Sequence, residues 1–576
     1  MTKLFNDPSS FMEDMLDGFL DANARYVVGV PGGVVRATET PQGKAAVVVG
    51  GGSGHYPAFC GVVGRGFADG AVVGNIFTSP SADDAASVAR AADNGGGVLL
   101  TTGNYAGDVM NFGLAVQKLR SEGIDARYLA VTDDIASAPK DQIAKRRGIA
   151  GDFTVFRCAS AAADSGYDMN GVERVGIAAN DATRTLGVAF DGCTMPGAAD
   201  PLFTVAQGTM DLGLGIHGEP GVSSHAMPTA SELAELLVDG VLAEKPAGSG
   251  DRIAVILNGL GRTKYEELFV VWSGAAARLR DAGYTIVDPE VGELVTSLDM
   301  AGCSLTVMWL DDELERLWTS PADTPAYRKG IVDADAGQRR SSDAVAAVDA
   351  DTLPESDESS RDCGTFVAAS LKALAERMAD AEDELGRIDA VAGDGDHGRG
   401  MVKGTAAGSK AADEAVSRRG GAGSVLAAAG SAWAAKAGGT SGVLWGAALT
   451  AIGNRLGNKG TPDDRAVAEA LRAGYDALTS LGGAALGDKT MLDAFDPFVG
   501  AIEKSVAGGN EWRTAWTDAV VVARTAADDT AELRPRVGRA RPLAEKSVGT
   551  PDAGAISLAM CVATVAELFT TRGLRS

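Results

Sequence analysis

Short runs of Val, Ile, Leu and Ala alternate with helical patterns through the first half of the chain, and this alternation constrains the fold more than any other feature. Buried runs separated by helical segments are typical of α/β layering, in which helices cover a sheet. Ligands of such sheets bind beyond the strand ends, so chemistry is expected in the loops that follow the strands. We expect strands at residues 45–49, 98–102, 127–131, 176–178, 187–190, 253–257, 284–287 and 305–310.

The pattern changes after residue 322. Residues 323–361 have no sustained apolar periodicity, which indicates a linker. Beyond them Val367, Leu371 and Leu374 recur at helical spacing, and Ala-rich helical segments follow without a convincing strand. We therefore predict an α/β domain over residues 1–322, a linker over 323–361 and an all-α domain over 362–576. A chain of 576 residues is long enough for more than one core.

The charge balance excludes several classes of partner. The chain has 52 basic and 77 acidic residues, a net charge of −25, which argues against nucleic acid or an anionic membrane. Its N-terminus carries Asp and Glu within the apolar pattern, unlike a secretory signal or a membrane span. Six cysteines without a CxxC pair suggest free thiols in a reducing cytoplasm. Anionic substrates are then expected to be held by metal, backbone amides or a local basic cluster.

Three carboxylates cluster near the two-thirds point of the chain, at Asp389, Asp394 and Asp396. Like charges this close need solvent or a bound cation, and oxygen ligands favour Mg²⁺. The glycines among them leave room for a bulky anion such as phosphate. The alternative is an acidic, solvated turn between two helices. The helical pattern on each side and the glycine-rich loops later in the domain favour the magnesium site.

The α/β half has three glycine-rich loops, of which the first two directly follow expected strands. The first holds His55, whose pKa suits a base at neutral pH, although a plain turn with a surface histidine is the alternative. The second holds Asp108, which alone is as consistent with a turn or a helix cap. The third places His217 between glycines and before a Glu-Pro-Gly turn, an open setting that favours a working group over a core histidine. His225 lacks that setting and is expected to be structural.

The helical half carries its own loops. Residues 438–442, GGTSG, begin a helix whose unpaired N–H groups and positive dipole end suit phosphate. Residues 482–490 resemble a P-loop, but an extra residue between Gly487 and Lys489 breaks the Walker spacing. Residues 538–541 and 551–554 add basic and turn elements.

Together these stretches resemble the dihydroxyacetone kinase family, and the resemblance covers nearly the whole chain. The strings that carry it are GGGSGHYP from Gly50, GNIFTSPS from Gly74, GNYAGDVMNF from Gly103, RRGIAG from Arg146, GIHGEPG from Gly215, DAVAGDGDHG from Asp389, GGTSG from Gly438 and GDKTMLDAF from Gly487. So many matches in order make chance an inadequate explanation.

The resemblance implies an α/β ketose-binding domain and a nucleotide-binding domain that forms an antiparallel helical barrel. It implies an ATP-dependent kinase that forms a homodimer. The ketose substrate would form a hemiaminal with His217, while His55 and Asp108 would help to deprotonate the attacking hydroxyl. The ketose loop would be Gly51, Gly52, Ser53, Gly54 and His55. Two Mg²⁺ ions would lie on Asp389, Asp394 and Asp396. The implied ATP-binding residues are His397, Gly398, Arg399, Thr440, Ser441, Gly482, Thr490, Met491, Arg539, Asp552, Ala553 and Gly554.

Departures from the family pattern leave the ketose open. Tyr56 stands where Glu is common, Gly103 where Lys is common, and Ala106 replaces Thr. An erythrulose kinase is therefore as consistent with the sequence as a dihydroxyacetone kinase. Two further alternatives are a lyase that makes cyclic FMN from FAD and a non-catalytic regulator. Retention of His217 and Asp108 speaks against the regulator.

Overall fold

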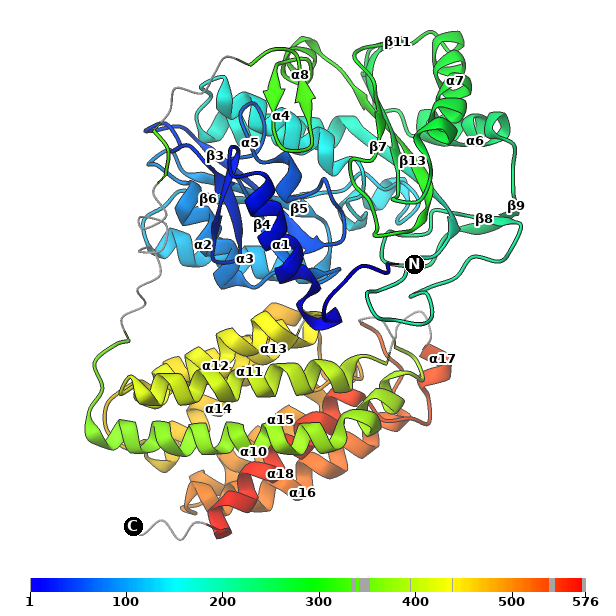
Figure 1. The fold of residues 1–576 in the computed structure, drawn as a ribbon. Coiled ribbons are helices and arrows are strands. Elements are labelled where there is room, and N and C mark those ends of the chain that lie inside the picture. The colour runs from blue at the N-terminus through cyan, green and yellow to red at the C-terminus, as the bar shows by residue number, and fades with distance from the viewer. Residues whose placement is uncertain are drawn as a thin grey trace. The chain divides into compact units, whose positions relative to one another are not determined.

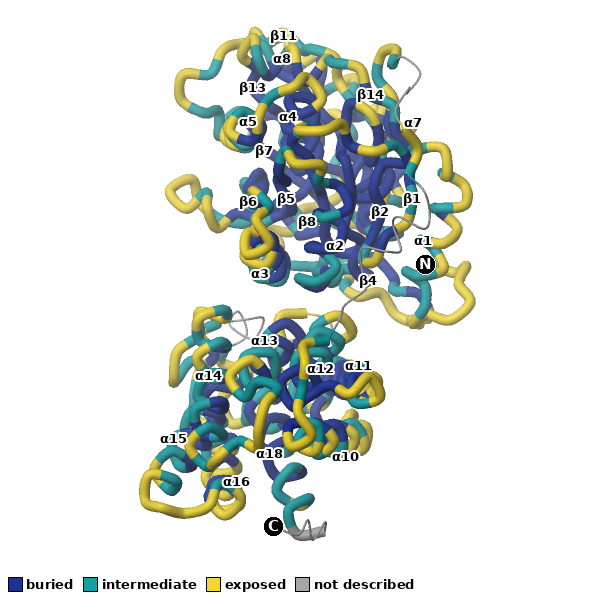
Figure 2. Tube along the Cα trace, turned by 90° about the vertical axis from the view of Figure 1, so that its left-hand side faces the viewer, coloured by how far each residue is buried: buried dark blue, intermediate teal, exposed yellow. Residues whose placement is uncertain are grey.

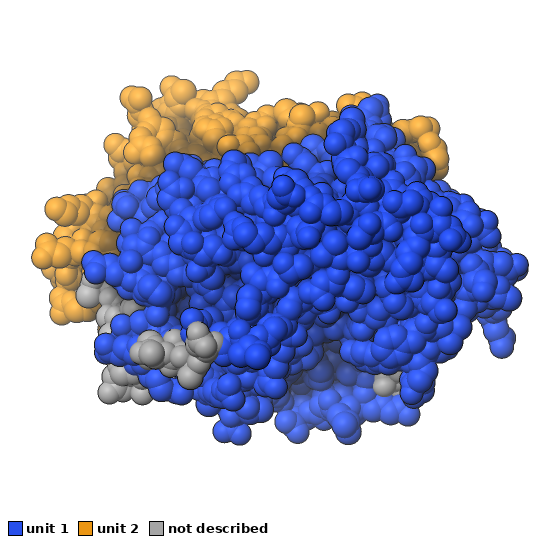
Figure 3. All heavy atoms as spheres, turned by 90° about the horizontal axis from the view of Figure 1, so that it is seen from above, with its two compact units in different colours: residues 1–349 blue, residues 350–576 orange. Residues whose placement is uncertain are grey.

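The structure, a computed structural model, describes residues 2–332, 338–340, 353–393, 395–437, 439–537 and 544–571. The chain divides into two compact units, Met1–Asp349 and Ala350–Ser576, which are described separately here (Figure 3). The division falls within the expected linker, residues 323–361. The β14 (Ala322–Asp323) and β15 (Arg328–Lys329) hairpin and the start of α10 (Glu358–Asp389) extend into that stretch.

The first sheet of unit 1 is mixed, with strand order β1-β2-β4-β3-β5-β6. Strands β4, β3, β5 and β6 pair in parallel, whereas β1 and β2 join through antiparallel pairs at one edge. Their bounds are β1 (Val27–Val30), β2 (Gly33–Arg36), β3 (Ala46–Ser53), β4 (Gly70–Ile76), β5 (Val98–Gly103) and β6 (Ala126–Val131).

Successive residues of β3 face opposite sides of this sheet, as strand geometry requires. Val48 packs with α2 (Ala82–Ala92) and α3 (Ala106–Ser121) on one side. Val47 and Val49 belong to the core on the other side, which includes residues of α1 (Phe11–Ala22), α4 (Asp152–Asp164), α5 (Met169–Ala182) and α8 (Asp312–Trp318). Figure 2 shows this strand-rich interior as the buried part of the unit.

The second sheet of unit 1 follows the order β11-β10-β13-β7-β8-β9, with β12 beside β10. Helices α6 (Ala230–Ala243) and α7 (Tyr265–Asp281) pack on it through an aliphatic core that includes Leu237, Leu268 and Val255. The strands are β7 (Thr183–Asp191), β8 (Thr209–Leu212), β9 (Ser223–Ala226), β10 (Arg252–Gly259), β11 (Thr285–Ile286), β12 (Glu290–Gly292) and β13 (Ala301–Trp309).

Most of the expected strands are confirmed, and one is wrong. Residues 176–178 lie inside α5 (Met169–Ala182), not in a strand. Asp168 caps this helix by accepting a hydrogen bond from the backbone N–H of Gly171, and Val172 and Val175 face the core at helical spacing. A run of three residues is too short to distinguish the helical period of about 3.6 residues from the strand period of about 2.

Unit 2 is helical throughout its described residues, in agreement with the predicted all-α domain. Consecutive helices pack on one another, and α18 packs against both α16 and α10, so the helices close into a ring (Figure 1). The helices are α10 (Glu358–Asp389), α11 (His397–Ser417), α12 (Ala422–Ala437), α13 (Gly439–Leu456), α14 (Asp464–Gly482), α15 (Leu492–Ala507), α16 (Trp512–Asp529), α17 (Ala544–Ser547) and α18 (Ala553–Thr571).

Close helix packing in unit 2 depends on glycine. A methyl group at Gly446 of α13 would lie 2.6 Å from the carbonyl oxygen of Gly430 in α12, so the two backbones touch without side chains between them. Trp433, Phe495 and Phe498 fill the core of the ring. None of the described helices is long and apolar enough to cross a bilayer.

Candidate functional site

Two strand ends of the first sheet deliver the predicted ketose loop and Asp108. β3 runs directly into Ser53 and His55, and β5 leads to α3, which carries Asp108 in its first turn. All three side chains are buried. A methyl group at Gly52 would lie 2.5 Å from the backbone nitrogen of Thr78, so the loop packs against that segment without space for a side chain. Gly51 and Gly54 also lie in this turn, Gly54 with φ of 100°.

His55 and His217 meet in the structure, although 162 positions separate them. His217 lies between β8 and β9, and its Nε2 is 3.0 Å from Nε2 of His55. The Nδ1 of His55 lies 2.7 Å from the carbonyl oxygen of Thr296, which can only accept, so this nitrogen carries a proton. The Nδ1 of His217 lies 3.0 Å from Oε1 of Glu219. A contact of 3.0 Å between the two Nε2 atoms then needs one proton between them.

The surroundings set the charges of this pair. Burial, followed by repulsion from His217, lowers the pKa of His55 to about 3, so His55 is neutral near pH 7. Burial alone would raise the pKa of Glu219, but the charge and hydrogen bond of His217, together with the charge of Arg147, lower it overall. Glu219 is therefore ionised and can balance a positive charge on His217.

Asp108 lies near this pair with one carboxylate oxygen unsatisfied. Its Oδ1 is enclosed and has no hydrogen-bond partner. Burial raises the pKa of Asp108 to about 6, although a hydrogen bond from Ser79 and the charge of His217 act in the opposite direction. A carboxyl group with this pKa is largely ionised at neutral pH and remains a competent base.

Aromatic rings enclose the two imidazoles. Phe77 stacks on His55 with ring centroids 5.1 Å apart, and Tyr105 meets His217 edge-on at 4.8 Å. The hydroxyl of Tyr105 is buried without a hydrogen-bond partner. Burial is the main reason that the pKa of Tyr105 is well above its usual value, so the hydroxyl stays protonated and is free to donate.

Several residues around the histidines were missed from the sequence: Phe77, Tyr105, Arg147, Glu219 and Thr296. Glu219 was read only as part of a turn, but its position two residues after His217 lets its carboxylate reach both the backbone N–H, at 3.0 Å, and the ring Nδ1 of that residue. Arg147 lies 3.7 Å from Glu219 and is also paired with Asp134.

Tyr56, which stands where Glu is common in the family, packs its ring edge-on against Phe19 of α1, with centroids 6.1 Å apart, and is 46% exposed. Its backbone carbonyl accepts a hydrogen bond from the Thr296 hydroxyl at 2.9 Å. The effect of Tyr56 on the histidine pair is therefore through the backbone.

In unit 2, helix ends bring the acidic residues together. Asp389 ends α10, Asp396 precedes α11 and Asp552 precedes α18. Asp389 and Asp552 line a cavity of about 40 Å³, which Lys489 also borders. Burial and then the charge of Asp389 raise the pKa of Asp396. Burial raises the pKa of Asp552 to about 7, and Asp389 adds a smaller increase.

These carboxylates fit a divalent cation. Oδ2 of Asp389 is enclosed without a partner, and the charge of Asp389 disfavours the ionised form of Asp396, so a bound cation would relieve both. The described residues contain no group of three or more His, Cys, Asp or Glu side chains placed to hold a metal. The predicted ligand Asp394 lies outside the described residues.

The predicted nucleotide residues are only partly connected by contacts. Nε2 of His397 lies 2.9 Å from the Ser557 hydroxyl, which links the starts of α11 and α18. A methyl group at Gly554 would lie 3.5 Å from Cβ of Met491. Ala553 borders the small acidic cavity described above. Gly398 is buried against α10, and Arg399 is exposed but close enough for its charge to lower the pKa of Asp396.

The remaining predicted residues lie at other helix ends. Thr440 and Ser441 are exposed in the first turn of α13, and no hydrogen bond of the described residues joins them to the acidic cluster. Gly482 ends α14, and a methyl group there would lie 3.3 Å from Leu444. The backbone N–H of Thr490 donates to Asp493 at 2.8 Å. Arg539 lies outside the described residues.

Lys489, which made residues 482–490 resemble a P-loop, has a structural role here. Its buried Nζ donates to the carbonyl oxygens of Ser547 at 2.7 Å, Thr550 at 2.8 Å and Leu533 at 3.2 Å. The ammonium group therefore holds together the backbone segments that precede α18 and Asp552.

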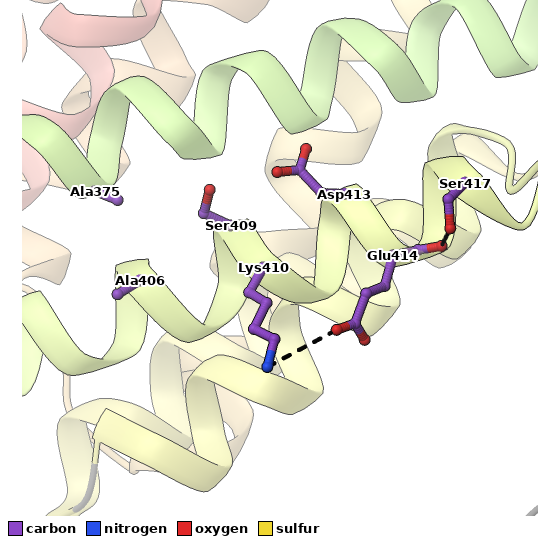
Figure 4. Close-up of a pocket in the computed structure, with 7 residues that line it drawn as sticks. All are labelled: Ala375, Ala406, Ser409, Lys410, Asp413, Glu414 and Ser417. Carbon is purple, nitrogen blue, oxygen red and sulfur yellow. Dashed lines mark hydrogen bonds and ion pairs between the residues drawn. The ribbon is translucent and has the colours of Figure 1, made fainter.

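A larger hollow lies elsewhere in unit 2. Its volume is about 550 Å³, and it is lined by residues of α10 and α11 that include Ser409, Asp413 and Glu414 (Figure 4). Lys410 and Glu414 approach to 4.0 Å across one helical turn. None of the predicted site residues lines this groove.

Comparisons with known proteins agree with both halves. The family model described as the Dak1 domain matches residues 17–326, and the DAK2 domain model matches residues 391–567. The D-erythrulose kinase of Mycolicibacterium smegmatis is 69% identical over 573 residues, which cover 99% of each chain. The L-erythrulose kinase of Pectobacterium atrosepticum is 54% identical over 573 residues, 99% of this chain and 97% of the relative.

A solved structure matches over both units. The crystal structure of the dihydroxyacetone kinase from C. freundii in complex with AMP-PNP and Mg²⁺ is 30% identical at a TM-score of 0.52, and the match covers 98% of this chain and 99% of that one. An α/β Dak1 unit followed by a helical DAK2 unit is therefore an arrangement shared along the whole chain.

Proposed function

The chain belongs to the dihydroxyacetone kinase family, and from this premise we propose that it transfers phosphate from ATP to a primary hydroxyl of D-erythrulose. It is an ATP-dependent ketose kinase, and its 69% identity to a D-erythrulose kinase supports the four-carbon sugar. Gly103 supports it further, because the long cation common at that position would take up space beside Asp108. The observation that carries the proposal is the contact between buried His55 and half-buried His217, beside the unpartnered Oδ1 of Asp108.

We infer that His217 binds the ketose covalently. Nε2 of His217 would form a bond to the carbonyl carbon while its proton passes to the carbonyl oxygen, giving a hemiaminal hydroxyl. Neutral His55 is placed to accept that proton and to return it to the oxygen. Glu219 is placed to accept a hydrogen bond from Nδ1 of the ring and to balance the positive charge that the ring of the adduct carries when Nδ1 bears a proton. A polyol without a carbonyl cannot form this bond, so the step selects ketoses.

Asp108 is our proposed base for the attacking hydroxyl. Its free Oδ1 can accept the proton as oxygen attacks phosphorus, and His55 assists. Ser53, whose hydroxyl is also buried without a partner, and the backbone of Gly51, Gly52 and Gly54 would bind the sugar hydroxyls.

In unit 2 we propose that Asp389, Asp394 and Asp396 hold Mg²⁺ with ATP. The cation supplies charge that neutralises the phosphates and orients them. Asp389 contributes an unpartnered oxygen, and the carboxyl groups of Asp389 and Asp396 are close enough to repel each other. The helix ends at His397, Thr440, Ser441, Met491, Asp552 and Gly554, with Gly398, Arg399, Gly482, Thr490, Ala553 and Arg539, are proposed to bind the nucleotide.

We also propose a homodimer. Strand β9 (Ser223–Ala226) is exposed along its length and forms an edge of the second sheet, where unpaired backbone groups can pair with another copy. Light scattering of the purified chain should give twice the mass of 58.6 kDa. A monomer at micromolar concentration would contradict this.

Substrate specificity tests the function directly. The values of kcat/KM for D-erythrulose, L-erythrulose and dihydroxyacetone should be measured with Mg-ATP on the purified chain. We expect D-erythrulose to exceed dihydroxyacetone by roughly ten- to a hundredfold, because an unsatisfied polar group in a closed site costs about 1 to 3 kcal/mol. Equal or better turnover of dihydroxyacetone would indicate that the chain is an ordinary dihydroxyacetone kinase.

The covalent step has a separate test. Crystals soaked with ketose, or intact-mass spectra of the complex, should show the sugar attached at His217, and His217→Ala should lose both the adduct and turnover. His225→Ala is the matched control, because His225 is an exposed histidine on β9 that bonds only Ser223 among the described contacts. An adduct on another residue would refute the assignment.

A further inference from the structure

One buried carboxyl group near the ketose loops has no part in the mechanism above. Asp152 opens helix α4, directly after the RRGIAG string, and is only 4% exposed. Its Oδ1 is enclosed and has no hydrogen-bond partner. A buried carboxyl oxygen without a hydrogen-bond partner is unfavourable, so a ligand that pairs with it would account for its retention.

Asp152 lies beside the loop that carries Asp108. A methyl group at Gly148 would lie 2.5 Å from Asp152 Oδ1 and equally 2.5 Å from Cα of Gly103, so no side chain separates the carboxyl group from Gly103. A methyl group at Gly103 would in turn lie 3.0 Å from the ring of Tyr105, the ring that contacts His217. Asp152 therefore belongs to the wall behind the histidine pair.

The environment of Asp152 favours its protonated form. Burial, then the charges of Asp133 and Asp108, raise its pKa well above the usual value for a carboxyl group. A neutral carboxylic acid can donate one hydrogen bond and accept another, as a sugar hydroxyl also can. The charge of Asp152 is also among those that raise the pKa values of Tyr105 and Tyr128, so it is close to both rings.

Asp152 does not stabilise the local backbone through hydrogen bonds from both carboxylate oxygens, as the neighbouring Asp133 does. Asp133 is equally buried, but its two oxygens accept hydrogen bonds from the backbone N–H groups of Ile149 and Gly151, at 2.9 and 2.8 Å. These bonds hold the turn before α4. Asp152 makes no such bond with Oδ1, so the hydrogen-bonding capacity of that atom is unused.

We propose that Asp152 is a specificity-determining residue of the ketose site, where its carboxyl group hydrogen-bonds the unphosphorylated hydroxyl that a four-carbon ketose has and dihydroxyacetone lacks. The proposal rests on the proposed function, because it assumes a four-carbon substrate. It also gives Gly103 a role: a methyl group there would lie 3.0 Å from the Tyr105 ring and 3.2 Å from the carbonyl oxygen of Gly148, so only glycine lets the Asp108 loop pack this closely against the segment that precedes Asp152.

The test compares substrates on the full-length enzyme. For wild type, Asp152→Asn and Asp152→Ala, kcat/KM is measured with D-erythrulose and with dihydroxyacetone. We expect Asp152→Ala to lower the D-erythrulose to dihydroxyacetone ratio roughly ten- to a hundredfold, mainly through KM for D-erythrulose. Asp152→Asn should keep most of the ratio, because an amide of the same shape also donates and accepts.

A control variant on the same helix separates binding from packing. Ser160 of α4 is buried and its hydroxyl also lacks a partner, but it lies two turns beyond Asp152, so Ser160→Ala should leave the ratio unchanged. Thermal melting and ATP affinity of each variant show whether the fold is intact.

The outcomes are distinct. A fall of both kcat/KM values by the same factor in Asp152→Ala would indicate a structural role and overturn the proposal. An unchanged ratio in Asp152→Ala, with wild type preferring D-erythrulose, would overturn the proposal while leaving the proposed function intact. A wild type that prefers dihydroxyacetone would overturn both.

Discussion

At the scale of single residues, the two proposed proton acceptors, His55 and Asp108, differ widely in pKa. Burial is the main cause of both shifts: it lowers the pKa of His55 to about 3 and raises the pKa of Asp108 to about 6. The acid limb of activity should therefore belong to Asp108. We expect kcat/KM for the ketose to rise as pH increases through about 6, and the Asp108→Asn variant to lose this limb and about 10²-fold or more in rate. A pH profile of both proteins measures this.

The same shift affects stability, with the opposite sign. A folded-state pKa above the unfolded value means that the folded protein binds more protons between about pH 4 and 6, so the stabilisation by Asp108 is present below that window and lost above it. Asp108→Asn should consequently be more stable than wild type at pH 7.5, by up to about 3 kcal/mol, and this advantage should shrink at pH 4. If wild type and Asp108→Asn had equal denaturation midpoints at both pH values, this would contradict a raised pKa for the buried carboxyl group of Asp108.

The acidic cluster of unit 2 gives a second prediction at this scale. Asp396→Asn should abolish Mg-ATP binding in calorimetry and lower turnover by about 10²-fold or more, while the ketose adduct still forms. Asp413→Asn, an exposed carboxylate on the same helix α11, is the control and should change neither. Near-normal ATP affinity in Asp396→Asn would remove Asp396 from the site.

Residue identities were easier to predict than side-chain directions. The glycine strings singled out His55, Asp108 and His217, because a reactive group beside glycines at a strand end is a local pattern. The direction of Tyr56 depends on Phe19, more than thirty positions away, and no local pattern reports it. Asp152 was missed for a similar reason: its burial depends on how α4 packs against the sheet.

At the scale of elements, Lys489 makes a stability prediction. Its ammonium group donates to three backbone carbonyl oxygens, those of Leu533, Ser547 and Thr550, and the bond to Ser547 is fully buried. Lys489→Met keeps the length of the side chain but leaves these oxygens unpaired, so we expect a loss of about 2 to 4 kcal/mol in unfolding free energy. ATP affinity should fall as well.

Denaturant titration and ATP calorimetry measure the two effects. Lys504→Met, on an exposed turn at the end of α15, offers a comparison in which neither quantity should change much. If Lys489→Met matched wild type in stability, the three hydrogen bonds would contribute little.

Element types followed from sequence where the pattern was long. The helices of unit 2 and most strands of unit 1 were predicted because their apolar periods persist over many residues. The short run at 176–178 failed, since Ile177 there is 44% exposed on a helix surface and gave a false strand signal. Closure of the helical ring was available only through the family resemblance, because contacts between α10 and α18 join segments far apart in the chain.

At the scale of the whole molecule, each unit has its own hydrophobic core. The cores of unit 1 draw only on residues before the division, and the core of unit 2 only on residues after it. We expect each unit to fold when expressed alone, with the first forming the ketose adduct and the second binding Mg-ATP. Calorimetric unfolding of the full chain should resolve two transitions, each shifted by its own ligand. A single transition moved equally by either ligand would show that the units unfold together.

The covalent joining of the two units has a kinetic consequence. In the proposed function, ketose and nucleotide are bound by different parts of one chain, so their encounter would be intramolecular and would proceed at an effective concentration fixed by the connection, independent of how dilute the enzyme is. Specific activity should thus be constant on dilution of the intact chain. For a mixture of separated halves, specific activity should fall with dilution. An excess of either half should restore it along a saturation curve. The midpoint of that curve measures the effective concentration that the peptide connection provides in the intact chain.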